Sequence, residues 1–149
     1  MFKTLSPLLR RRPIHRLAHD VVDALSGRSI RRVVLVGDGA SAVREVLRER
    51  LPSAQLVLLD DDDQSHQPWD GWADLAIAAW AHHSAPVSLA ARLARVARPD
   101  GYVAVLDDGE LSLVDALQRT VAAVGWAIES PPTGGEPTLT FLGRTAWAA

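Results

Sequence analysis

Four short runs of mostly apolar residues constrain the fold of this chain most strongly. They occupy residues 32–36, 55–59, 74–80 and 102–106. Continuous apolar runs of this length are typical of strands that are buried on both faces, as the strands of parallel sheets are. We therefore expect these four segments to form the centre of one sheet.

Amphipathic segments lie between and around these runs. Apolar residues recur at helical spacing in four stretches, which predicts helices over 13–25, from after Gly39 to Leu51, over 86–98 and over 113–124. Two further strands are expected at 126–129 and 138–142. The alternation predicts an α/β fold: a Rossmann-like, mainly parallel sheet with helices on both faces and an antiparallel hairpin at the C-terminal edge.

Length and composition indicate one globular domain. The chain has 149 residues, of which 48% are hydrophobic and 23% charged. We expect residues 1–27 to form a helical lead-in and residues 28–149 an α/β core. The net charge of −2 gives no reason to expect a nucleic-acid partner. The lack of cysteine excludes disulfides, thiolate metal sites and a cysteine nucleophile, and it agrees with a reducing cytoplasm.

The N-terminal segment lacks the sequence pattern of a targeting signal. Its apolar stretch is short, and three arginines at 10–12 follow it, whereas a secretory signal has its basic residues first. No apolar run reaches the roughly 18 residues that a membrane span requires. We predict a cytoplasmic protein with no membrane span, and a solvent-exposed surface for the three arginines.

A glycine turn joins the first expected strand to a helix. Gly37 and Gly39 allow a tight turn and a close approach of the backbone to a ligand, and the following helix contributes unpaired N–H groups. Asp60 ends the second strand about 20 residues further on, where a carboxylate can accept hydrogen bonds from ribose hydroxyls. The segment 37–42 fits G-x-G-x-x-A, which is compatible with NAD-type dinucleotides and with other nucleotide cofactors.

Later segments favour one cofactor class. DLAIAAWAHH (74–83), LAARLARVARPDGYVAVLDD (89–108) and the closing TLTFLGR (138–144) follow the glycine turn in order. Together they resemble three parts of the class I S-adenosylmethionine-dependent methyltransferases. These parts are a strand that ends near histidines, a helix followed by a proline–glycine turn and a strand, and a final hairpin. The resemblance covers roughly residues 31–144 and implies S-adenosylmethionine as the cofactor and a small molecule as the methyl acceptor.

The resemblance also implies roles for individual residues. It places Gly37, Asp38 and Gly39 beneath the methionine end of the cofactor. Asp60, helped or replaced by Asp61, would meet the ribose. The residues expected beside the pocket, at the ends of the third and fourth strands, are Trp80, His82, His83 and Asp107. A histidine there could act as a general base, because its pKa lies near neutrality, and at most one of the two would face the pocket.

The chain departs from the family pattern at three points. Leu35 stands where the family commonly has an acidic residue, and Ser41 where it has a third glycine. Residues 61–73 are also too few for the helix and strand that the family places after its second strand. We therefore expect a sheet that lacks one helix–strand unit and whose exposed edge could pair with another chain, as a homodimer or a heteromer.

Two other functions remain open from the sequence. One is a catalytically inactive methyltransferase-like subunit that scaffolds or activates a partner protein. The other is an NAD-type dinucleotide-binding module. Trp69 and Trp72 could stack on a ligand, cover a partner surface or fill the space of the missing strand. His15 and His19 have metal-ligand spacing on one helix but no evident third ligand, so no metal site is predicted.

Overall fold

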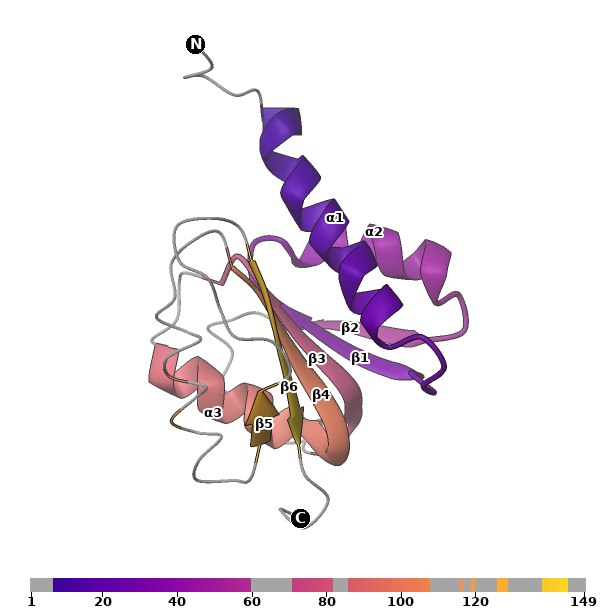
Figure 1. Ribbon diagram of the computed structural model, residues 1–149. Coiled ribbons are helices and arrows are strands. Elements are labelled where there is room, and N and C mark those ends of the chain that lie inside the picture. Colours follow the sequence, from indigo (N-terminus) through magenta and orange to yellow (C-terminus); the bar gives the residue numbers. More distant parts are fainter. Residues whose placement is uncertain are drawn as a thin grey trace.

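A computed structural model of the protein describes residues 7–59, 71–81, 86–107, 116, 119, 126–128 and 138–144 (Figure 1). Its elements, in chain order, are α1 (Pro7–Ala24), β1 (Arg32–Val36), α2 (Ala40–Arg50), β2 (Gln55–Leu59), β3 (Ala73–Ala79), α3 (Pro86–Val96), β4 (Ala97–Asp107), β5 (Trp126–Ile128) and β6 (Thr138–Arg144). No helix among these residues is both long enough and apolar enough to cross a membrane.

The strands form one six-stranded sheet in the order β2-β1-β3-β4-β6-β5. The pairs β1–β2, β1–β3 and β3–β4 are parallel, whereas β6 runs antiparallel to both β4 and β5. This topology confirms the predicted α/β fold with its antiparallel C-terminal hairpin. Among the described strands β2 pairs only with β1, so β2 is an edge strand, as expected where a helix–strand unit is missing.

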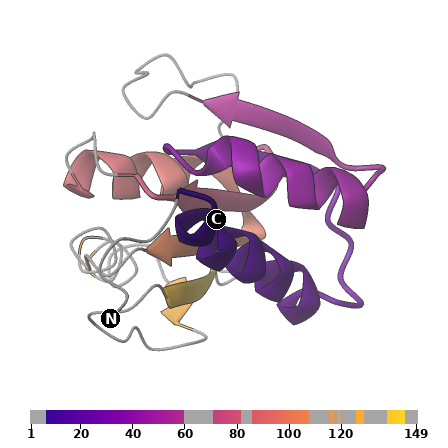
Figure 2. The ribbon, with the colours of Figure 1, turned by 90° about the horizontal axis from the view of Figure 1, so that it is seen from above.

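Helices cover the sheet on both faces. Val33 and Leu35 of β1 face a core cluster built with α1 and α2, whereas Val34 and Val36 face a second cluster built with α3. All four side chains are buried, which explains why the β1 sequence is continuously apolar. Figure 1 shows α3 on one side of the sheet and α1 and α2 on the other, and Figure 2 shows α1 and α2 side by side.

The first helix follows its predicted face but begins earlier. The apolar residues that were expected to pack inward and are buried are Ile14, Leu17, Ala18 and Val21 of the helix and Leu25 directly after it. The helix starts at Pro7 and not at Pro13. Pro7 can occupy a first helical turn for the same reason as Pro13, since no intrahelical N–H is needed there. The backbone therefore continues through Pro13 with one helical hydrogen bond fewer.

The fourth strand is longer than the sequence indicates. Residues 99–101 were predicted to form a turn, but they belong to β4 and accommodate a shift in its register against β3. Ala73 pairs with Ala97, and Leu75 pairs with Tyr102. A Cβ on Gly101 would lie 3.0 Å from the backbone oxygen of Ala73, so glycine allows the strands to approach at the irregularity. Only residues 116 and 119 of the predicted helix 113–124 are described, and both are helical.

A buried carboxylate fixes the amino end of the sheet. Asp74, at the start of β3, accepts hydrogen bonds from the backbone N–H groups of Arg31 and Arg32 at 2.8 and 3.0 Å. Its other oxygen lies 2.8 Å from the guanidinium of Arg98. These contacts offset the cost of burying the Asp74 carboxylate, and they satisfy backbone donors at the entry to β1.

Candidate functional site

The turn after β1 requires glycine because β3 passes close to it. Gly37 has a φ of +108°, a conformation that side chains with a Cβ rarely adopt. A Cβ at this position would overlap the backbone oxygen of Ala79 and would lie 3.2 Å from the Cα of Ala81. The first glycine of the motif is therefore explained by packing of the turn against the end of β3.

The third residue of the turn packs against α1. A Cβ on Gly39 would overlap the Cδ1 atom of Ile14 and would lie 3.1 Å from the Cβ of Ala79. Gly39 is buried, whereas Asp38 is exposed. A ligand at this turn would therefore contact Gly37 and Asp38 rather than the buried Gly39.

Backbone hydrogen bonds tie the turn to the end of β3. The N–H of Asp38 donates to the carbonyl of Trp80 at 3.3 Å, and the N–H of Gly39 donates to the carbonyl of Ala79 at 3.0 Å. These two donors are therefore engaged within the chain. The turn has a fixed position relative to β3, which provides a rigid support for neighbouring groups.

The N-terminus of α2 carries the unengaged donors of the turn. Its N-cap residue, Gly39, makes no side-chain capping hydrogen bond. The N–H of Ala40 donates to the carbonyl of Gly37 at 3.1 Å. Among the described residues, the N–H groups of Ser41 and Ala42 have no partner, as is usual in a first helical turn. This end of the helix carries a positive partial charge and suits a carboxylate or phosphate group.

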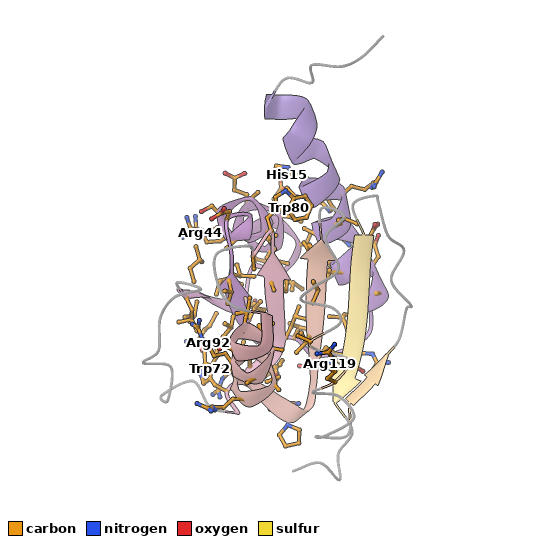
Figure 3. All side chains as sticks on the ribbon, turned by 90° about the vertical axis from the view of Figure 1, so that its left-hand side faces the viewer. His15, Arg44, Trp72, Trp80, Arg92 and Arg119 are labelled. Atoms are coloured by element: carbon orange, nitrogen blue, oxygen red, sulfur yellow. The ribbon has the colours of Figure 1, made fainter. Side chains whose placement is uncertain are left out.

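Trp80 adopts an unusual backbone conformation where β3 ends. Its φ is +51°, which is uncommon for a bulky residue and indicates local strain. Its N–H donates to the carbonyl of Leu106 at 3.1 Å, and its half-buried ring packs against the cluster formed by α1 and α2. Figure 3 places Trp80 beside His15, at the opposite end of the molecule from Trp72.

The structure brings several predicted site residues to one edge of the sheet. The glycine turn (Gly37, Asp38 and Gly39) follows β1, Trp80 follows β3, and Asp107 ends β4, where its backbone pairs with Thr138. These strands are neighbours in the sheet, so their carboxyl ends meet at one edge. Asp60, Asp61, His82 and His83 lie outside the described residues, and their roles remain predictions. Trp69 also lies outside them.

Trp72 does not lie at this edge. It precedes β3, so it lies at the amino end of the sheet, where it packs against the core cluster on the α3 side. The guanidinium of Arg32 lies 5.6 Å from the centroid of its ring. The ring is therefore remote from the glycine turn, and a role in stacking on a ligand there is excluded.

The two histidines with metal-ligand spacing both face α2. His15 lies 3.6 Å from a carboxylate oxygen of Glu45, and the Nδ1 of His19 lies 2.9 Å from the guanidinium of Arg50. Arg50 also pairs with Asp23 at 2.6 Å. No group of three potential metal ligands occurs in the described part of the chain. These polar contacts hold α1 against α2 and so keep Ile14 on the glycine turn.

Ile14 is a residue of the site that the sequence did not reveal. The apolar periodicity of α1 identifies it as inward-facing, but nothing in that periodicity identifies Gly39 as its neighbour. That contact depends on how α1 lies across α2, which is a tertiary feature.

The sequence matches no protein-family model and no curated protein. Solved structures do resemble the fold. A precorrin-6y C5,15-methyltransferase from Geobacter metallireducens matches with a TM-score of 0.65 at 8% identity, over 87% of each chain. A release-factor-specific protein-(glutamine-N5) methyltransferase from Alicyclobacillus acidocaldarius matches with a TM-score of 0.63 at 15% identity, over 97% of this chain and 99% of the other.

A third structure is larger than this chain. An O-methyltransferase family protein from Burkholderia thailandensis matches with a TM-score of 0.60 at 12% identity, over 92% of this chain but only 59% of its own length. The protein thus has the fold of the class I S-adenosylmethionine-dependent methyltransferases. At these identities the likeness establishes the fold alone.

Proposed function

We propose that the protein binds S-adenosylmethionine at the carboxyl edge of β1 and β3 and transfers its methyl group to a small-molecule acceptor. One observation carries the proposal. The whole described sheet, with its antiparallel end, matches a methyltransferase of nearly the same extent, over 97% of this chain and 99% of that one. Ligands of open α/β sheets bind at the carboxyl ends of the strands.

The residues at this edge fit the chemical groups of the cofactor. The N–H groups of Ser41 and Ala42, which have no partner among the described residues, suit the carboxylate of its methionine part. Asp60 directly follows β2 in sequence, which is where a carboxylate would meet the ribose. When bound, the cofactor supplies an electrophilic methyl group on a sulfonium.

The protein's own contribution would be positioning and proton removal. Methyl transfer depends chiefly on aligning a nucleophile with the methyl group. His82, His83 or Asp107 would take the proton of a hydroxyl or amine acceptor, because these residues follow or end strands at this edge. The Geobacter protein supports a small acceptor, since it is named for methylating a precorrin and matches over 87% of both chains.

Isothermal titration calorimetry tests the proposal. We expect saturable binding of S-adenosylmethionine and S-adenosylhomocysteine and none of NAD. Asp60→Ala should weaken binding about tenfold, because a charge-assisted hydrogen bond is lost. Asp20→Ala is the matched control, since Asp20 is an exposed aspartate on α1, away from the turn. If correctly folded protein binds neither S-adenosyl compound, the proposal is wrong.

A second candidate function has its own supporting observation. Ile14 packs on Gly39, and the N–H groups of Asp38 and Gly39 donate to β3. These contacts would also suit a methyltransferase-like subunit whose turn serves packing. Its β2 edge, which no second described strand covers, would pair with a partner protein. The calorimetric experiment separates the two, because such a subunit needs no cofactor. Sedimentation with and without candidate partners would then be the next measurement.

A further inference from the structure

A cavity of about 210 Å³ lies at the amino end of the sheet, opposite the glycine turn. Its apolar wall is formed by residues of four elements or their ends: Leu25, Ile30, Leu51 and Leu75. Leu25 and Leu75 are buried, and Ile30 and Leu51 are half-buried. β1 separates this cavity from the glycine turn by five residues, or roughly 16 Å of strand. A ligand here would therefore not occupy the proposed cofactor site.

Two arginines line the same cavity. Arg28 and Arg50 are exposed, and both residues belong to the cavity wall. Arg50 is already paired with Asp23 at 2.6 Å. Arg28 instead donates to the hydroxyl of Tyr102 and lies over its ring, at 4.9 Å from the centroid. Within the described residues no carboxylate pairs with Arg28.

Size restricts what the cavity can hold. Its volume is below the ~300 Å³ at which pockets for drug-sized ligands begin. A ligand with one carboxylate and a short apolar tail matches both the charge of the arginines and the apolar wall.

We propose that this cavity is a binding site for short-chain monocarboxylates, whose tail contacts Leu25, Ile30 and Leu75 and whose carboxylate pairs with Arg28. The planar guanidinium can bind a carboxylate through two parallel hydrogen bonds. This inference does not depend on the proposed methyltransferase function, and its test requires no cofactor.

The test is a titration of ¹⁵N-labelled protein with sodium hexanoate, followed by amide chemical shifts. We expect saturable shifts at residues around the cavity, with a dissociation constant on the order of 1 mM, as suits so small a ligand. Hexanol lacks the charge and acetate lacks the tail, so each should bind at least several-fold more weakly.

Two matched variants locate the carboxylate. Arg28→Gln should weaken hexanoate binding about tenfold, through loss of a charge-assisted contact. Arg31→Gln makes the same change of charge at an exposed arginine that does not line the cavity, and it should leave the affinity unchanged. If hexanol binds as well as hexanoate, if both variants weaken binding equally, or if no shift saturates, the proposal is overturned. If Arg28→Gln loses its folded spectrum, the comparison of hexanoate with hexanol on the natural protein decides.

Discussion

Replacement of Gly37 by alanine tests the packing of the turn directly. Two costs follow from the structure. The φ of +108° is unfavourable for alanine by about 1–3 kcal/mol. The new Cβ would also overlap the backbone oxygen of Ala79. Relief of that overlap separates the turn from the end of β3. It breaks the hydrogen bonds that Asp38 and Gly39 donate to the carbonyls of Trp80 and Ala79, each worth about 1 kcal/mol. We expect a total loss of unfolding free energy of about 3–5 kcal/mol.

Gly27→Ala is the matched control. Gly27 also has a positive φ, at +86°, but a Cβ there would have no atom within 4 Å. This variant should lose only about 1–2 kcal/mol, the cost of the left-handed conformation. The difference of about 2 kcal/mol corresponds to roughly 4–8 °C in the melting temperature of a domain of this size. Urea and thermal unfolding followed by circular dichroism measure both. Equal losses in the two variants would refute the close packing of the turn on β3.

Two further substitutions test contacts that hold the sheet and the glycine turn in place. Asp74→Ala should lower the unfolding free energy by about 2–4 kcal/mol, because two backbone N–H groups at the entry to β1 lose their acceptor; in urea unfolding, a loss no larger than that of Asp20→Ala would contradict this role. Ile14→Ala should cost about 2–4 kcal/mol, since the side chain is 3% exposed and its removal leaves a cavity above the turn; a loss below about 1 kcal/mol would show that α1 does not pack on Gly39.

The sequence was sufficient to predict the sheet. The four apolar runs became β1 to β4 because continuous apolar segments are stable only when both faces are covered, and the helices between them supply that cover. The order of the later motifs indicated the methyltransferase fold, and structural similarity supports it. The local turn signals were less reliable. Pro99 and Gly101 were predicted to form a turn, but they lie within β4, where its register against β3 is irregular.

The candidate site could be predicted only in part. The positions of Gly37, Asp38, Trp80 and Asp107 at one edge follow from strand order and parallel pairing. The reason for the glycines does not follow from the sequence, because the motif is the same whether a ligand or the chain itself approaches the backbone. Here the atoms that exclude a side chain belong to Ala79 and Ile14, from β3 and α1. The strained conformation of Trp80 likewise depends on tertiary context.

The most direct test of the central claim is where S-adenosylhomocysteine binds, measured by amide chemical shifts of the ¹⁵N-labelled protein. We predict saturable shifts at Asp38, Ser41 and Ala42, at the turn and the start of α2, with residues 27–30 at the other end of β1 unchanged. Shifts confined to other regions, or none at saturating ligand, would contradict the assignment of this edge as the cofactor site.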